Sequence, residues 1–325
     1  MLIDIGFLIL GLVLVVKGGG WFVDSSVDIA RYLQIPRIVI GATIVSLATT
    51  MPELIVSATA SFMKDSGIAI GNAVGSAICN IGLIVGIAAV MTTIEVDLSD
   101  FKRRFMWMLG SAVLMVIFAW NLHLGRLQGS ILLLVGIAYL LFDYSKVRSE
   151  RRGKNVSPNQ AVGETPAKKS VGRSVILFAF GALLVILGSR FLVTSGIGIA
   201  KALGIPSVII GLSIIAVGTS LPELVTAIAA ARKKVPDLSV GNIVGANVLN
   251  LAVITGLAGV INPLTLKPFT RHYSFFWLFL FILAMGWFFR KKGSIAAREG
   301  WCFLIFYILY VAGLVLAPVA FKIPM

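Results

Sequence analysis

Residues 33–54, LQIPRIVIGATIVSLATTMPEL, occur a second time as residues 203–224, LGIPSVIIGLSIIAVGTSLPEL. The match continues without a gap to residues 71–80, GNAVGSAICN, which reappear as residues 241–250, GNIVGANVLN. Every matched pair lies 170 positions apart, and the shared residues include prolines, glycines, asparagines and glutamates. The chain therefore contains two copies of one sequence unit, and this duplication decides the expected fold.

The composition is that of a membrane protein. Of the 325 residues, 58% are hydrophobic and 13% are charged, and the mean hydropathy is +0.98. A soluble domain carries about 25% charged residues. Apolar runs long enough to cross a hydrocarbon core of about 30 Å as helices recur along the chain. We expect ten transmembrane helices, over residues 3–31, 38–63, 67–91, 104–121, 128–145, 174–203, 206–230, 238–261, 273–290 and 299–318.

These spans predict an all-α polytopic membrane protein whose ten transmembrane helices form two inverted five-helix repeats. The first repeat would cover residues 1–145, a cytoplasmic linker loop residues 146–173, and the second, inverted repeat residues 174–325. Because each copy holds an odd number of spans, the second must enter the membrane upside down relative to the first. Repeats of this kind are typical of secondary transporters, whose site lies near the midplane where the copies meet.

The net charge of +14 follows the predicted membrane topology. With the N-terminus outside, about 20 Lys and Arg of the connections fall on the inner side and about six on the outer side, which is the positive-inside pattern. The charge thus indicates orientation and not nucleic-acid binding. We predict a multi-pass protein of the plasma membrane with both termini outside. We expect the lipid bilayer around it, no cofactor, and no obligate protein partner.

Two glutamates occupy equivalent positions near the middle of apolar spans. Placing an ionisable side chain at the bilayer centre costs about 2.5–3.5 kcal/mol on insertion scales, and this sequence does so at Glu53 and at Glu223. Neither span contains Lys or Arg. The basic residues deep in other spans, Lys17 and Arg190, are not equivalent in the repeat, and we interpret them as snorkelling or locally paired. A bound cation would supply the missing positive charge.

A proline directly precedes each glutamate. Pro52 and Pro222 lack an N–H group, and each ring crowds the carbonyl four residues earlier, so both helices should open. The oxygens presented at the two openings belong to Ala48, Thr49 and Thr50 in the first copy and to Gly218, Thr219 and Ser220 in the second. A site made only of oxygens with two carboxylates suits Ca²⁺ better than Zn²⁺ or copper. The alternative is that the prolines only kink the helices and each glutamate is a buried, protonated structural acid.

The third and eighth spans supply matching polar faces. Residues four apart share one face of a helix, and these faces carry Asn72, Ser76 and Asn80 in the first copy and Asn242, Ala246 and Asn250 in the second. The glycines between them would also permit close helix packing. Because an asparagine recurs at 80 and 250, we favour a role in lining an ion site over packing alone. Cys79 and Cys302 lack metal-ligand spacing and predict neither a disulfide nor a site.

At these motifs the sequence resembles the cation/calcium exchanger superfamily, and it looks most like the prokaryotic sodium/calcium exchanger branch. The resemblance rests on the pattern around ATTMPE and GTSLPE together with GNAVGS and GNIVGA, in both halves, and it covers the whole chain. It implies an antiporter, not an enzyme, that exchanges Na⁺ for Ca²⁺ by alternating access at four central helices. The long first and sixth helices would slide across this core.

The resemblance also implies roles for individual residues. Glu53 and Glu223 would bind Ca²⁺ together with the carbonyls of Thr49 and Thr219. The same glutamates would bind Na⁺ in competition, with the help of Thr50, Ser220, Ser76 and the carbonyls of Ser46 and Ala216, and the central site would be completed by Asn80 and Asn250.

Some positions depart from the family pattern. Ala48 replaces a glycine, and Ala246 stands where a serine is common, which puts in doubt the hydroxyl ligand of one peripheral Na⁺ site. Ala77 replaces a frequent asparagine that Asn247 keeps. Relatives driven by protons or potassium tend to carry an extra acid on the third or eighth helix, whereas this chain has asparagines there, which favours Na⁺.

Three other functions remain open from the sequence. The same fold could exchange H⁺ for Ca²⁺ or another divalent cation. A membrane-embedded acid-base enzyme would need two inequivalent carboxylates, whereas the repeat gives the two glutamates similar surroundings. A cation channel would need pore-lining rings from an oligomer, whereas one chain already carries both halves of a pseudo-symmetric site.

Overall fold

The computed structural model describes residues 2–32, 45–153, 171–232 and 236–320, and nearly all of them are helical. The helices, π-helical turns (η) and strands in chain order are α1 (Leu2–Tyr32), α3 (Val45–Thr49), α4 (Met51–Phe62), α5 (Ser66–Cys79), η2 (Asn80–Val85), α6 (Gly86–Met91), β1 (Ile94–Glu95), α7 (Leu98–Ala119), β2 (His123–Leu124), α8 (Arg126–Gly153), α9 (Val171–Leu203), α10 (Ser207–Ile210), η3 (Gly211–Ile215), α11 (Ala216–Thr219), α12 (Leu221–Arg232), α13 (Pro236–Val248), η4 (Leu249–Ile254), α14 (Thr255–Ile261), β3 (Leu264–Thr265), η5 (Thr270–Ser274), α15 (Phe275–Lys292), β4 (Ser294–Ile295) and α16 (Ala297–Ala320).

Within the described ranges, seven stretches of helix are long and apolar enough to cross a membrane. An eighth candidate is a broken span that joins Ser207–Thr219 to Leu221–Ile228 across a bend of 42°. These candidates confirm the predicted class of a mostly helical polytopic membrane protein. The seven are Leu2–Phe22, Ser66–Met91, Arg126–Ser145, Val171–Leu203, Val240–Ile261, Thr270–Lys291 and Ala297–Leu314.

The count of ten predicted spans is not reached by these candidates. The predicted span 38–63 begins outside the described residues, and its described part consists of the short helices α3 and α4. The predicted span 104–121 lies in α7, which starts earlier, at Leu98, and carries Lys102, Arg103 and Arg104 in its first two turns. These charges leave a shorter apolar stretch than the sequence pattern suggested.

The predicted linker 146–173 also differs at its ends. Helix α8 continues to Gly153 and α9 begins at Val171, and residues 154–170 lie outside the described part of the chain. The continuation of α8 is built largely from Lys, Arg and Glu, which have high helix propensity.

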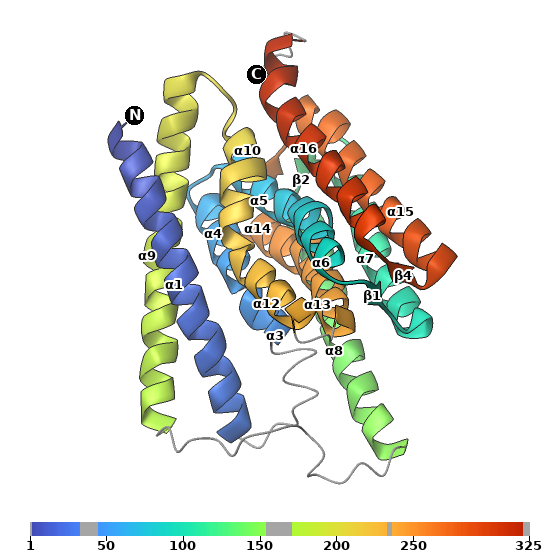
Figure 1. The fold of residues 1–325 in the computed structure, drawn as a ribbon. Coiled ribbons are helices and arrows are strands. Elements are labelled where there is room, and N and C mark those ends of the chain that lie inside the picture. The colour runs from blue at the N-terminus through green and yellow to red at the C-terminus, as the bar shows by residue number, and fades with distance from the viewer. Residues whose placement is uncertain (1, 33–44, 154–170, 233–235, 321–325) are drawn as a thin grey trace.

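Two of the candidate spans form the centre of the bundle. In the most apolar window of Ser66–Met91, 78% of the residues are buried, and in that of Val240–Ile261 the share is 89%. The other candidates are 28–39% buried, as expected for helices with one face toward lipid. The third and eighth predicted spans are therefore the core, and the remaining helices surround them (Figure 1).

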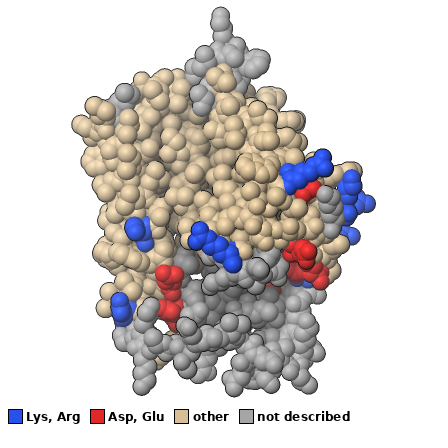
Figure 2. Space-filling view, viewed as in Figure 1, with Lys and Arg blue, Asp and Glu red and all other residues tan. Residues whose placement is uncertain are grey.

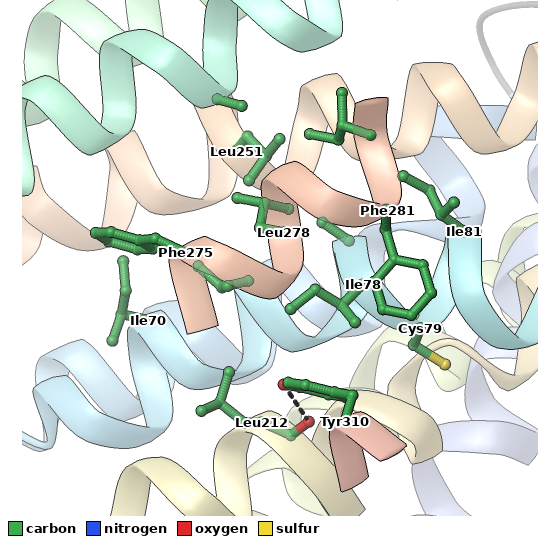
Figure 3. Packing of buried hydrophobic residues seen from close by; sticks show 14 of the residues in the cluster. Ile70, Ile78, Cys79, Ile81, Leu212, Leu251, Phe275, Leu278, Phe281 and Tyr310 are labelled. Carbon is green, nitrogen blue, oxygen red and sulfur yellow. Dashed lines mark hydrogen bonds between the residues drawn. The ribbon is translucent and has the colours of Figure 1, made fainter. Parts of the chain in front are cut away.

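Aromatic side chains of the last two helices cover the first of these central spans. Phe281 of α15 lies beside Ile78 and Cys79 at the end of α5, and Tyr310 of α16 lies below them (Figure 3). The Tyr310 hydroxyl donates to the carbonyl of Leu212, in the π-helical turn η3, at 3.5 Å. Helix α16 thus joins the central helix of the first copy to the broken span of the second. Cys79 and Cys302 are both free thiols, as predicted.

Short polar caps fix where the helices start. Asp65 precedes α5, and its carboxylate accepts from the Ile68 N–H at 2.7 Å and from the Ser207 hydroxyl at 2.8 Å, so it also ties α5 to the start of α10. Asp97 caps α7 in the same way. The Ser99 hydroxyl and the backbone N–H groups of Asp100 and Ser99 donate to Asp97 and lower the pKa of its carboxyl.

Two small ribbons connect the copies. Strand β1 pairs with β4 with Ile94 opposite Ile295, and β2 pairs with β3 with Leu124 opposite Leu264, both antiparallel. Strands β1 and β3 lie 170 positions apart in the sequence, like the matched motifs. Each ribbon therefore takes one strand from the first half of the chain and one from the second.

Helices α1 and α9 lie side by side along most of their length at one edge of the molecule (Figure 1). Glycines permit this approach, because a β-carbon on Gly11 would lie 2.9 Å from the Gly188 carbonyl oxygen and one on Gly18 would lie 2.8 Å from that of Gly181. Small residues that let backbones approach are typical of packed membrane helices. Gly11 and Gly18 are equivalent in the repeat to Gly181 and Gly188, so equivalent glycines face one another crosswise.

Charged side chains avoid much of the visible surface. Among the coloured atoms of Figure 2, the upper part of the face is tan, whereas Lys, Arg, Asp and Glu occupy its middle and lower parts. The Arg104 guanidinium of α7 forms a buried ion pair: it lies 2.9 Å from the Asp143 carboxylate of α8 and 3.1 Å from the more exposed Asp100. Lys17 and Arg190 lie exposed on α1 and α9, as expected for snorkelling side chains.

We predict that Gly18→Ala separates α1 from α9. The added methyl group would meet the Leu184 β-carbon at 2.7 Å, and overpacking of this kind costs about 1–3 kcal/mol. Gly6→Ala on the same helix is the matched control, because Gly6 is exposed and no described atom lies within 4 Å of an added β-carbon. Thermal unfolding of the detergent-solubilised protein should show a lower Tm for Gly18→Ala alone. Equal melting temperatures for both variants would contradict the close packing.

A second prediction concerns the buried ion pair. Asp143→Ala leaves the Arg104 guanidinium in the protein interior with Asp100 as its remaining carboxylate partner, and loss of one partner of a buried pair costs about 3 kcal/mol. Asp100→Ala removes a carboxylate whose side chain is 43% exposed and should cost less than about 1 kcal/mol. The same unfolding measurement tests both variants, and a larger loss for Asp100→Ala would reverse the assignment of the stabilising partner.

Candidate functional site

Both proline-glutamate motifs interrupt a helix at equivalent positions. Helix α3 ends at Thr49 and α4 begins at Met51, with Thr50 between them at φ −84° and ψ 0°. Helix α11 ends at Thr219 and α12 begins at Leu221, with Ser220 at φ −84° and ψ 7°. Because the prolines that follow have no N–H group to donate, the carbonyls of Ala48 and Gly218 lose their usual helical partner. The openings expected from the sequence are therefore present in both copies.

The two glutamates that follow these breaks are fully buried. The Ser220 hydroxyl donates to Glu53 Oε1 at 2.9 Å, so the first glutamate reaches the break of the second copy. Glu53 Oε2 and both carboxylate oxygens of Glu223 have no hydrogen-bond partner. Among the described residues, the ion pairs involve other carboxylates, and neither glutamate has a basic partner.

A polar network surrounds the Glu53 side of the site. Asn72 of α5 donates to the Glu53 backbone carbonyl at 3.0 Å and accepts from the Thr219 hydroxyl at 3.0 Å. The Ser76 hydroxyl lies 3.4 Å from the Thr219 hydroxyl and 3.5 Å from the Ala216 carbonyl. Residues predicted from both copies are thus in direct contact, and Asn72 joins the backbone at one break to the side chain at the other.

Asparagines line the deeper part of the site. Asn80 and Asn250 lie in the π-helical turns η2 and η4, a local geometry that is frequent at functional sites. The Asn80 amide donates to Asn247 Oδ1 at 2.9 Å, and the Asn247 amide donates to the Ala77 carbonyl at 3.2 Å. Asn80 Oδ1 and both polar atoms of the Asn250 side chain lack partners although they are buried.

The opposite half of the site is arranged differently. The Thr50 hydroxyl donates to the carbonyls of Ser46 and Leu47, at 2.9 Å and 3.2 Å, instead of reaching Glu223. The Ser46 hydroxyl donates to Asn242 Oδ1 at 2.5 Å. Ala246, which stands in place of Ser76, contributes only a methyl group to this buried region. The two halves therefore have equivalent helix breaks but different side-chain hydrogen bonds.

One contact of the site was not expected from the sequence. Ser57 is buried four residues after Glu53 and accepts from the Asn72 amide at 2.9 Å. The i, i+4 spacing on the helix of a buried glutamate is the signal that could have identified it. Its repeat equivalent is Ala227, so the repeat itself did not point to this position.

The donor set fits a hard cation. Among the predicted site residues, the buried oxygens without partners are carboxylate and amide oxygens, at Glu53, Glu223, Asn80 and Asn250, and these are ligands that Ca²⁺ and Na⁺ accept. No group of three or more His, Cys, Asp or Glu that could hold a metal occurs within the described ranges. Two carboxylates with neutral oxygens in the core of a membrane bundle are typical of cation transporters.

Comparison with known proteins assigns the family. The sequence model of the sodium/calcium exchanger protein family matches residues 3–145 and 173–316, and the chain belongs to this family. The family is one of transporters and not of enzymes. The resemblance noted in the sequence is therefore confirmed.

Several relatives match over almost their full length. An uncharacterized membrane protein of Methanocaldococcus jannaschii is 33% identical over 97% of this chain and 99% of its own. The sodium/calcium exchanger MaX1 of Methanosarcina acetivorans is 31% identical over 95% and 98%. A solved structure of the sodium-calcium exchanger NCX_Mj, soaked with 2.5 mM Na⁺ and 0.1 mM Ca²⁺, aligns over 97% of this chain and 99% of that chain with a TM-score of 0.64 and 31% identity.

Proposed function

We propose that this protein is a secondary antiporter that exchanges Na⁺ for Ca²⁺ by alternating access, at a midplane site built on Glu53 and Glu223. The observation that carries the proposal is the burial of both carboxylates at equivalent helix breaks without a basic partner. The cost of burying them would be offset by the transported cation. Family membership and the likeness to sodium/calcium exchangers support the choice of ions.

The proposed ligands are oxygens from both copies. Ca²⁺ would bind between the two carboxylates and the backbone carbonyls at the breaks, and Na⁺ would use the same carboxylates with nearby hydroxyls and carbonyls. This set comprises Glu53, Glu223, Thr49, Thr219, Thr50, Ser220, Ser76, Ser46 and Ala216, with Asn80 and Asn250 at the central position. Asn72, Asn242 and Asn247 would position the ligands, because the side chain of each is hydrogen-bonded to a neighbouring polar group.

Competition for one pair of carboxylates would couple the two ion flows. One Ca²⁺ neutralises both negative charges, and Na⁺ ions can do so only in greater number. Without either load, two like charges would face each other in a medium of low dielectric, where their repulsion is strong. The protein would therefore reorient readily when loaded and rarely when empty, and each Ca²⁺ that crosses in one direction would require Na⁺ to cross in the other.

We further propose that the chain crosses the membrane ten times, as two inverted repeats joined by the cytoplasmic residues 146–173. The equivalent helix breaks and the two ribbons, each with one strand from each half, support a pseudo-two-fold relation between the copies. The excess of Lys and Arg in the predicted inner connections supports an orientation with both termini outside the plasma membrane.

The test is ⁴⁵Ca²⁺ uptake into proteoliposomes that contain the purified protein. Uptake should require an outward Na⁺ gradient and should fall by at least about tenfold, about 1.4 kcal/mol, in Glu53→Gln and in Glu223→Gln. Each substitution keeps the size of the side chain but removes one of the two charges that must balance Ca²⁺.

Two controls separate this mechanism from its rivals. Glu95→Gln changes an exposed glutamate of strand β1 and should leave uptake unchanged. Uptake driven equally well by a pH gradient without Na⁺ would replace Na⁺ by H⁺ as the driving ion. Exchange that persists in either buried-glutamate variant would overturn the shared site.

A further inference from the structure

The two copies place a hydroxyl group on opposite sides of one helix contact. In the first half of the site Ser76 faces Ala216, and in the second half the equivalent positions hold Ala246 and Ser46. The serine therefore lies on the central helix in the first half and on the helix that precedes the break in the second half, and the alanine lies on the other helix in each case. This difference matters because a hydroxyl oxygen is a cation ligand and a methyl group is not.

In the first half the hydroxyl comes from the central helix α5. Ser76 Oγ lies 3.5 Å from the Ala216 carbonyl and 3.4 Å from the Thr219 hydroxyl. The helices are in close contact there, since a β-carbon on Gly75 would lie 2.8 Å from the Ala216 β-carbon. Any side chain at position 216 therefore adjoins the residues that flank Ser76.

In the second half the hydroxyl comes from α3 instead. A β-carbon on Gly245 would lie 3.5 Å from Ser46 Oγ, so Ser46 occupies the place beside α13 that Ala216 occupies beside α5. The Ser46 hydroxyl is buried and donates to Asn242 Oδ1 at 2.5 Å. A serine hydroxyl has one donor hydrogen and two acceptor lone pairs, and the bond to Asn242 uses the hydrogen.

The second half also needs a further oxygen. Ser220 donates to Glu53, but the equivalent Thr50 hydroxyl is directed back to the carbonyls of its own helix. Both carboxylate oxygens of Glu223 are without a hydrogen-bond partner, and Ala246 offers no polar atom. Of the side chains that the repeat places at this contact, Ser46 carries the hydroxyl.

We propose that the Ser46 hydroxyl is the side-chain oxygen that binds Na⁺ in the second half of the site, in place of the hydroxyl that Ala246 lacks. The inference rests on the proposed Na⁺/Ca²⁺ exchange and deepens it. Both peripheral Na⁺ positions would then have a serine hydroxyl ligand, which comes from α5 in the first half and from α3 in the second. Ser46 would act on Na⁺ and not on Ca²⁺, because Ca²⁺ would lie between the carboxylates and the carbonyls of Thr49 and Thr219.

The test measures Ca²⁺ binding and its displacement by Na⁺ in purified full-length protein in lipid nanodiscs, by isothermal titration calorimetry. Ser46→Ala should leave the Kd for Ca²⁺ within about twofold and should raise the Na⁺ concentration that halves Ca²⁺ binding by about fivefold to tenfold. The Hill coefficient for Na⁺ should also fall, because one Na⁺ position is weakened.

A rescue variant distinguishes a ligand from a structural role. Ser46→Ala combined with Ala246→Ser returns a hydroxyl to the contact but not the hydrogen bond between residues 46 and 242. Na⁺ displacement in this double variant should return to within about twofold of the unmodified protein. A failure to recover would show that Ser46 serves only to hold Asn242, and would overturn the proposal.

The first half provides a matched control. Ser76→Ala should weaken Na⁺ displacement, and Ser76→Ala combined with Ala216→Ser should recover it by giving the first half the arrangement of the second. An unchanged Na⁺ response in Ser46→Ala would overturn the inference while Na⁺/Ca²⁺ competition itself stands. An absence of Na⁺ displacement in the unmodified protein would instead overturn the proposed exchange and this inference with it.

Discussion

The structure depends on the burial of two carboxylates that have no basic partner. Glu53 and Glu223 are inaccessible to solvent, and three of their four oxygens lack a hydrogen bond. A carboxylate in such a place is costly unless something of positive charge meets it. The surrounding residues are arranged around this requirement: prolines open the helices, hydroxyl and amide groups cluster at the openings, and the most deeply buried helices carry the asparagines.

The rest of the bundle covers this centre from two sides. Aromatic residues of α15 and α16 cover α5, and the Tyr310 hydroxyl reaches a carbonyl in the broken span of the other copy. Helices α1 and α9 approach the opposite side, where a β-carbon on Gly19 would lie 3.3 Å from the Pro52 ring and 3.8 Å from the Pro222 ring. One helix thus touches both prolines, so the two halves of the site share a common wall.

The sequence predicted the features that the duplication encodes twice. The helix breaks, the buried glutamates and the polar faces of the third and eighth spans follow from matched motifs, because a paired signal is hard to explain by chance, whereas the central position of these spans was implied by the family resemblance. The hydrogen-bond partners of individual side chains could not be predicted in this way. Thr50 and Ser220 occupy equivalent positions, yet the Thr50 hydroxyl donates to the Ser46 carbonyl of its own helix and the Ser220 hydroxyl donates to Glu53. This difference depends on packing between distant parts of the chain.

Features without a repeat counterpart were missed for the same reason. Ser57 and the Arg104–Asp143 pair have no equivalents in the second copy, and sequence separation alone does not bring α7 and α8 together at that point. Arg104 pairs with Asp143, which lies one helix further along the chain. Helix α7 starts earlier than expected because Asp97 caps it.

The two small ribbons suggest how such a chain arose. Each consists of one strand from either half, β1 with β4 and β2 with β3, which is the contact that two separate copies of a single half would make across a two-fold axis. With the proposed inverted topology and shared site, a half-length ancestor would have paired its strand edges and its carboxylates as a dimer of oppositely inserted subunits. Fusion would then have made the two subunits one chain and left residues such as 46, 76, 216 and 246 free to diverge.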